Sequence, residues 1–422
     1  MIQQAKLKNG LRMIVAPRHE TEAVTALVLF KVGSRNETKD INGVSHFIEH
    51  LMFKGTKKRP TTLSISKELD GIGAEYNAFT SKDYTGYYIK ANAEKLPLLL
   101  DILSDMLYNS KFDPKEIERE RGVIIEEINM YRDNPLMYID DVFEGAMYGD
   151  HPLGWDIAGP RKIIRTVSRA KLVAYKNTFY QPNNTNVIVA GRVNEKTIFD
   201  QIRFAFETNK KSKALPKPKK KTITQKKPTI ALSYKETEQV QMALGYPAYP
   251  YNHKNLIALH VLAAVLGGNM SSRLFIQVRE RRGLAYSVRA GVSMYEDTGN
   301  FMVQSGLAHD RVDEALKVIF QELKLIQQKG ITAIELGRAK EFLKGQLVLQ
   351  MEDSRNAANY YGQQALFQPS IKTPHERERE VERVTRADVL RVAKDIMKMS
   401  RLTLAIIGPY KDKAHFIKLL SR

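Results

Sequence analysis

The sequence of 422 residues contains no cysteine. A chain without cysteine forms no disulfides and offers no thiolate metal ligands, so a reducing compartment suits it. The first residues lack the apolar core of a signal peptide, and one of the most apolar stretches, residues 96–107, is interrupted by Asp101 and Asp105. That stretch is too short to span a bilayer. We therefore expect a cytoplasmic protein with no membrane partner.

Histidine is scarce as well, with 9 copies, yet His46 and His50 stand four positions apart in the run H-x-x-E-H. The apolar flanks predict a helix, on which both imidazoles project from one face and can hold one zinc ion. Glu49 lies beside the metal without having to bind it, and can accept a proton from an activated water. The motif predicts metal-assisted peptide hydrolysis, although the wet face of an ordinary amphipathic helix can also carry it.

Two histidines make an incomplete site, because catalytic zinc usually has three protein ligands. Residues 113–128 begin like a helix, with an Asp-Pro start and an apolar stripe at helical spacing. Glu120 and Glu127 are seven positions apart on this segment, which places them on one face. Solvated helix surface is an equally good interpretation of each carboxylate, and Glu126 is the alternative ligand.

Together, the H-x-x-E-H run and the helical E-x6-E pair resemble the pitrilysin and mitochondrial processing peptidase family of zinc endopeptidases, the inverzincins. The resemblance implies one zinc ion per chain, held by His46, His50 and Glu127. It also implies Glu49 as the base and Glu120 as the acidic residue that supports the site from behind. The resemblance covers nearly the whole chain, whose length matches a single family subunit.

The two halves of the chain resemble each other. Residues 167–170 and 384–387 are similar and 217 positions apart, and Gly191 and Gly408 are separated by the same interval. A constant offset at separated points indicates a duplication. We predict two homologous domains of α+β class, each a largely antiparallel sheet covered by helices, because strands and helices are segregated more than they alternate.

A basic segment divides the halves, with nine lysines and two prolines within residues 210–227. This composition is typical of an extended linker. The predicted organisation is an N-terminal zinc-binding catalytic domain at 1–208, a Lys/Pro-rich linker at 209–228 and a C-terminal domain at 229–422.

The C-terminal half lacks the metal ligands. Residues 262–268, opposite the histidine motif, contain no ligand side chain, and the alignment of the halves places Ala339 opposite Glu120 and Gln346 opposite Glu127. The N-terminal half alone is therefore expected to hold zinc, which leaves substrate binding to the C-terminal half.

The resemblance also implies substrate-binding residues. Arg279 and Tyr286 match the arginine and tyrosine that grip the substrate backbone, where the tyrosine can hydrogen-bond the oxyanion. Without the family, an ordinary surface arginine cluster with a half-buried tyrosine is the better interpretation. Asn77, Ala78 and Phe79 resemble the edge strand that pairs with an extended peptide, although Phe79 also suits a place in the core.

The formal net charge is +19, which raises the possibility of a nucleic-acid partner. No recognition motif with interleaved aromatic residues is present, so we do not expect one. The resulting prediction is a zinc-dependent endopeptidase that cleaves peptides or unfolded segments inside a closed chamber, as a homodimer. The alternative is a non-catalytic scaffold or a processing subunit of a hetero-oligomeric complex.

Overall fold

The computed structural model describes residues 2–208 and 212–420, so residues 1, 209–211 of the predicted linker, and 421–422 lie outside the described part. The chain divides into two compact units. Unit 1 contains Met1–Ile128, Asp156–Lys219 and Val348–Thr373, and unit 2 contains Asn129–Trp155, Lys220–Leu347 and Pro374–Arg422. The domain boundaries expected from the sequence, at 1–208, 209–228 and 229–422, stay a prediction.

Unit 1 is built on a six-stranded sheet with the order β1-β2-β6-β3-β5-β4. Its strands are β1 (Gln3–Lys6), β2 (Arg12–Pro17), β3 (Ala23–Phe30), β4 (Glu75–Thr80), β5 (Thr85–Asn92) and β6 (Thr185–Gly191). Neighbours pair antiparallel except β2 and β6, which are parallel. The central strands are nearly continuous apolar runs, because both of their faces are buried.

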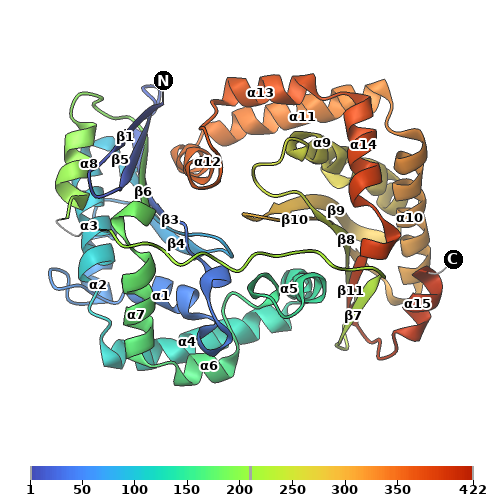
Figure 1. The fold of residues 1–422 in the computed structure, drawn as a ribbon, viewed down its shortest axis with the longest axis horizontal. Helices are drawn as coiled ribbons and strands as arrows, with labels where there is room; N and C mark the ends of the chain where they lie inside the picture. The colour runs from blue at the N-terminus through green and yellow to red at the C-terminus, as the bar shows by residue number, and fades with distance from the viewer. Residues whose placement is uncertain (1, 209–211, 421–422) are drawn as a thin grey trace. The chain divides into compact units, whose positions relative to one another are not determined.

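Helices cover both faces of this sheet (Figure 1). They are α1 (Val44–Met52), α2 (Thr62–Asp70), α3 (Leu96–Asn109), α4 (Pro114–Asp133), α6 (Arg161–Thr166), α7 (Arg169–Phe179), α8 (Ile198–Phe206) and α12 (Ser354–Phe367). Ala26 and Val28 of β3 face the cluster that includes α1, α3 and α4, whereas Leu27 and Leu29 pack beneath α12. This alternation follows from the two-residue period of a strand.

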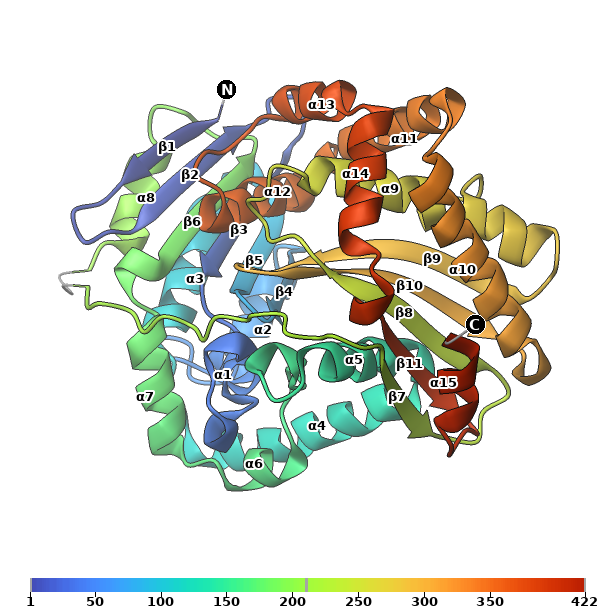
Figure 2. The same ribbon diagram turned by 45° about the vertical axis from the view of Figure 1, so that its right-hand side comes forward.

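Unit 2 has a five-stranded sheet with the order β7-β11-β8-β10-β9. Its strands are β7 (Thr229–Tyr234), β8 (Val240–Ala248), β9 (Ala285–Met294), β10 (Gly299–Leu307) and β11 (Thr403–Gly408). Its helices are α5 (Pro135–Tyr148), α9 (Leu256–Gly267), α10 (Val312–Lys329), α11 (Ala333–Met351), α13 (Pro374–Arg383), α14 (Arg386–Ile396) and α15 (Ala414–Leu420). Figure 2 shows α9, α10 and α14 against one face. Helix α5 packs on the other face, over Ala405 and Ile407.

The strand order of unit 2 repeats the order β2-β6-β3-β5-β4 of unit 1, including the parallel pair, which is β11 with β7. The predicted α+β class with two similar, largely antiparallel sheets is confirmed. Each sheet also takes one covering helix from the other half of the chain, α12 in unit 1 and α5 in unit 2. None of the helices in the described part of the chain combines the length and apolar character needed to cross a membrane.

Candidate metal centre

Helix α1 carries both histidines of the H-x-x-E-H run. Its apolar side chains, including Phe47, Ile48 and Leu51, are completely buried, which holds the helix at a fixed rotation against the sheet. The helix begins after Gly43, whose φ is 99° and whose added Cβ would lie 2.6 Å from the carbonyl oxygen of Ala158. Glycine suits this position because other residues rarely adopt that φ and have no room for a side chain there.

A buried carboxylate, Glu37, holds the beginning of α1. Its oxygens accept hydrogen bonds from the backbone N–H groups of Gly43 at 2.8 Å and Ser45 at 2.6 Å, and from the Asn42 amide at 2.9 Å. The first N–H groups of a helix have no partner within the helix, and negative charge is favourable there. Burial raises the pKa of Glu37 to about 7. Glu37 could not be predicted from the sequence, because no local pattern marks a carboxylate in the preceding loop as a helix cap.

Three ligand atoms converge beside α1. Nε2 of His46 lies 3.2 Å from Nε2 of His50, and Oε2 of Glu127 lies 3.5 Å and 3.4 Å from these two nitrogens. Tetrahedral ligands at about 2.0–2.1 Å from zinc are separated from one another by roughly 3.3 Å. The triangle therefore has the size that a zinc ion requires, and two imidazoles with one carboxylate form a donor set that catalytic zinc uses.

Helix α4 supplies the acidic residues. Ile117, Ile124 and Ile128 are buried in the core of unit 1, which orients Glu120 and Glu127 toward α1. Glu120 is only 2% exposed, and its Oε2 lies 3.3 Å from Nδ1 of His50. Glu126, the alternative ligand, is exposed and does not belong to the converging group.

The electrostatics of the group stabilise a positive charge. Burial, together with the neighbouring His50, lowers the pKa of His46 to about 4. Burial also lowers the pKa of His50, but its hydrogen bonds to Glu120 and Glu127 outweigh burial and raise that pKa to about 9. The hydrogen bond to His50 lowers the pKa of Glu127. Burial raises the pKa of Glu120, but its bonds to His50 and Lys54 more than offset this and lower it. A cation is therefore favoured where the ligand atoms meet.

Glu49 lies on α1 beside the ligands without being one of them. Its Oε2 accepts a hydrogen bond of 2.5 Å from the hydroxyl of Thr80, the last residue of β4. Burial raises the pKa of Glu49, which is the usual behaviour of a carboxylate in a low-dielectric site. Thr80 was not predicted as a site residue, since a threonine at the end of a strand carries no distinguishing signal in the sequence.

Strand β4 contains Asn77, Ala78 and Phe79 at one end of the sheet order. No other described strand pairs with its outer edge. The side chain of Asn77 accepts a hydrogen bond from the N–H of Ala78 at 2.8 Å. Phe79 packs edge-on against Tyr84 with 5.8 Å between ring centroids and joins the cluster under α12. Phe79 is thus a packing residue in this structure, whereas the backbone of β4 offers an open edge.

Arg279 and Tyr286 lie together in unit 2, whereas the other predicted site residues lie in unit 1. Arg279 lies in the last turn of a π-helical segment, Phe275–Glu280, and its guanidinium carbon lies 4.8 Å from the ring centroid of Phe275 and 5.3 Å from that of Tyr286. Tyr286 is 77% exposed at the start of β9. Short π-helical segments occur frequently at functional sites.

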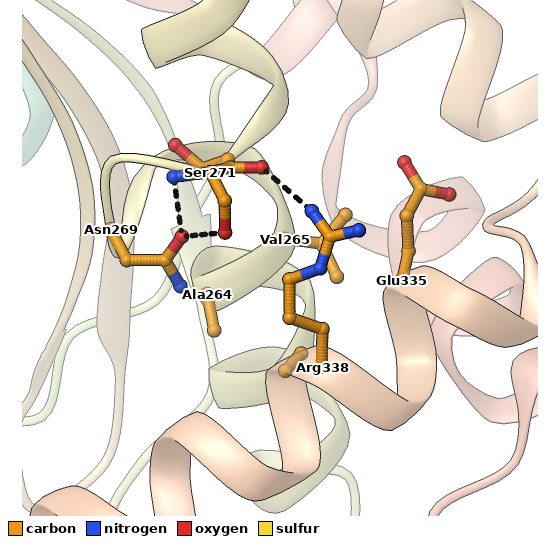
Figure 3. A pocket seen from close by; sticks show the side chains of 8 residues that line it. Ala264, Val265, Asn269, Ser271, Glu335 and Arg338 are labelled. Atoms are coloured by element: carbon orange, nitrogen blue, oxygen red, sulfur yellow. Dashed lines mark hydrogen bonds between the residues drawn. The ribbon is translucent and has the colours of Figure 1, made fainter.

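Among its described residues, the second unit has no group of three metal-ligating side chains at the equivalent place in the repeat. Helices α9 and α11 there enclose a cavity of about 20 Å³, whose lining includes Ala264, Val265, Arg338 and Ala339. Figure 3 shows Arg338 directed to the backbone carbonyl oxygen of Ser271, at 3.4 Å. The cavity has room for about one water molecule and presents no imidazole.

Two family models match the chain. A model described as insulinase (peptidase family M16) matches residues 12–161, and a model described as peptidase M16 inactive domain matches residues 166–343. An uncharacterized zinc protease of Streptomyces coelicolor is 36% identical over 98% of this chain and 90% of its own length. An uncharacterized zinc protease of Bacillus subtilis is 36% identical over 97% of this chain and 98% of its own length.

Solved structures show the same similarity. A crystal structure of a protease from Helicobacter pylori matches with a TM-score of 0.92 and 27% identity, covering 97% of this chain and 99% of that chain. A peptidase M16 inactive domain from Pseudomonas fluorescens matches with a TM-score of 0.88 at 19% identity, covering 97% of this chain and 98% of that chain. At 19% identity, the second match shows that the folds are similar and nothing more.

Proposed function

The chain belongs to the insulinase family of peptidases, peptidase family M16, and from this premise we propose that it is a zinc-dependent endopeptidase. One observation carries the proposal. The ligand atoms of His46, His50 and Glu127 form a triangle of the size that zinc requires, and Glu49 lies beside them. A zinc ion bound there would lower the pKa of a water molecule and polarise the peptide carbonyl group.

Glu49 is the proposed general base. It accepts a proton from the attacking water and passes it to the leaving amine, a role that requires a carboxylate close to the metal but free of it. The pKa of Glu49 is raised by burial, which brings it closer to neutral pH and improves proton transfer in both directions. Thr80 holds one oxygen of Glu49 through a hydrogen bond of 2.5 Å and so leaves the other oxygen for the water.

The proposed substrates are peptides and unfolded segments. The open edge of β4 can pair with an extended peptide through main-chain hydrogen bonds, which bind without reading the sequence of side chains. We assign Arg279 to gripping the substrate backbone and Tyr286 to hydrogen-bonding the oxyanion. The proposal includes a homodimer in which peptides are cleaved inside a closed chamber, and a reducing, cytoplasmic setting, which suits a chain without cysteine.

Mass spectrometry of a mixed peptide pool tests the proposed activity. The zinc-loaded protein is incubated with the pool beside a Glu49→Gln variant, which keeps the ligands but lacks the base. Products that appear with the unmodified protein alone would establish a peptidase and reveal its residue preference. We expect Glu49→Gln to retain zinc and to lose about 100-fold or more in turnover. Turnover near that of the unmodified protein would reject Glu49 as the base.

Absence of products from both proteins would contradict the endopeptidase and favour the alternative. The chain would then act as a non-catalytic scaffold or as a processing subunit that needs a different partner chain. Repeating the assay with such a partner separates these two possibilities, because a processing subunit gains activity on mixing and a scaffold does not.

A further inference from the structure

Lys54 lies directly beyond the metal-binding helix. Its backbone N–H donates to the carbonyl oxygen of Leu51 at 3.1 Å, which continues the turn after α1 and directs the side chain toward α4. There its Nζ lies 2.9 Å from Oε1 of Glu120. The other oxygen of Glu120 lies 3.3 Å from Nδ1 of His50. Lys54, Glu120 and His50 thus form a continuous chain that ends at a ligand of the proposed metal.

The positive charge of Lys54 offsets part of the desolvation cost of burying Glu120. A carboxylate that is 2% exposed pays a large desolvation cost unless a cation and hydrogen bonds compensate for it. Lys54 binds one oxygen, and the second oxygen remains available to accept the Nδ1–H of His50. A histidine that donates through Nδ1 presents the lone pair of Nε2, which is the form that a metal ligand requires.

The two histidines differ in this respect. Nδ1 of His46 is buried and has no hydrogen-bond partner within residues 2–208 and 212–420. Its side chain is buried, with Nε2 3.2 Å from Nε2 of His50. A hydrogen bond at Nδ1 therefore orients His50, through Glu120, but not His46. The position of Glu120 in turn depends on Lys54.

We propose that Lys54 is a positioning residue of the metal centre, which holds Glu120 so that Glu120 fixes His50 in the tautomer and orientation that bind a divalent metal ion. The inference deepens the proposed function, because it names a residue outside the metal-binding group on which that group depends. The ion pair of Lys54 in the described part of the chain is with Glu120, so its effect is expected to pass through Glu120.

Three variants test the role of Lys54. Lys54→Met removes the charge and keeps much of the apolar stem, and Lys54→Arg keeps a cation that can bind the carboxylate. Lys58→Met is the matched control, because Lys58 lies on the same loop as Lys54 but pairs with Asp101 of α3, at 2.6 Å. The side chain of Lys58 is 60% exposed. The affinity for zinc alone is measured by competition with a fluorescent chelator, without any substrate.

We expect Lys54→Met to bind zinc about 10- to 100-fold more weakly, the usual effect of losing a partner behind a ligand. Lys54→Arg should stay within a few fold of the unmodified protein, and Lys58→Met should not change the affinity. Nitrogen NMR of the metal-free protein, recorded at a pH above the His50 pKa of about 9 so that the imidazole is neutral, should show the Nδ1–H tautomer of His50 in the unmodified protein and a mixture in Lys54→Met. Unchanged affinity and an unchanged tautomer in Lys54→Met would overturn the proposal.

A double-mutant cycle separates positioning from general destabilisation. In a Glu120→Gln background the carboxylate is gone, so Lys54→Met should cost little further zinc affinity. A further loss of about 10-fold or more in that background would overturn a role through Glu120. These experiments measure zinc affinity and the tautomer of His50, and neither requires peptidase activity. The role of Lys54 can therefore be rejected independently of the proposed endopeptidase activity, which the peptide-pool assay tests.

Discussion

The five strands of unit 2 follow the same order as five of the six strands of unit 1, yet the helices at the equivalent place in the two units differ in composition. In unit 1, α1 presents two imidazoles and a carboxylate along one side while its other side is buried. In unit 2, nearly every residue of α9 is buried and apolar, and no side chain caps its beginning. The sheet and its covering helices thus do not require the metal ligands, because hydrophobic burial alone can hold a helix at that place.

The difference is sharpest where the repeat aligns Glu120 with Ala339. These side chains are 2% and 3% exposed, respectively, so the two positions are equally removed from water. Alanine needs no partner there, whereas the carboxylate of Glu120 is bound by Lys54 and lies against His50. A buried charge of this kind is costly, and in unit 1 it lies against an imidazole that is proposed to bind the metal.

The largest expected effect concerns the ligand that unit 2 lacks. Glu127→Gln should reduce zinc affinity by more than about 100-fold, beyond the range seen for residues behind the ligands. Gln346→Ala, at the aligned position in unit 2, should leave the affinity unchanged. Equilibrium dialysis followed by elemental analysis gives the zinc content of both variants. If Glu126→Gln loses zinc while Glu127→Gln retains it, the register of the third ligand is wrong.

The next prediction concerns Tyr286, through which unit 2 is proposed to bind the oxyanion; its loss should affect turnover but not zinc binding. Tyr286→Phe should lower kcat by about 100- to 1000-fold, the range for removal of an oxyanion donor, and should retain zinc. Tyr234→Phe, at another exposed tyrosine of unit 2, serves as the control and should have little effect. Steady-state kinetics on a cleaved peptide measure both variants.

Mixing Tyr286→Phe subunits with Glu49→Gln subunits extends this test to the proposed homodimer. Activity above that of either parent would mean that the tyrosine of one subunit serves the metal centre of the other. Activity that never exceeds the parents would count against sharing between subunits.

The smallest expected effect is a pH-dependent difference in stability. The pKa of Glu37 in the folded state is about 7, above the value of about 4.3 in an unfolded chain. Its contribution to stability is therefore fully present below about pH 4.3 and is lost as the pH rises through about 7. Relative to Glu37→Gln, the unmodified protein should lose up to about 3 kcal/mol of unfolding free energy across this window.

Urea unfolding of the metal-free proteins at several pH values measures that difference, and Glu335→Gln in unit 2 is the control. Burial raises the pKa of Glu335, but its hydrogen bonds to Arg273 outweigh burial and lower that pKa to about 2. Its stabilisation is present above about pH 4.3 and is lost as the pH falls toward 2. The Glu335→Gln difference should thus stay constant between pH 5 and 7. A constant Glu37→Gln difference over the same range would contradict the role of burial at Glu37.

Local patterns in the sequence were enough to predict the helix that carries both histidines and the fold class. The four-residue spacing of His46 and His50 places both on one face of any helix, and the duplication is visible in repeated segments. The third candidate ligand was harder to predict, because helical spacing alone favoured both Glu120 and Glu127. The resemblance to a family selected Glu127, with Glu126 as the alternative. The structure places Glu127 in the converging group and leaves Glu126 exposed.

By itself, the sequence determined which half of the chain carries the H-x-x-E-H run and that both of its histidines share one helix face, because those properties depend on residue type and short-range helical spacing. The tertiary structure alone decided that Glu37 caps α1, that Thr80 holds Glu49 and that Lys54 reaches Glu120. The last two contacts join residues far apart in the chain, and the Glu37 cap is made across an irregular loop. Such contacts depend on how buried helices and strands pack against one another, and no local pattern encodes that packing.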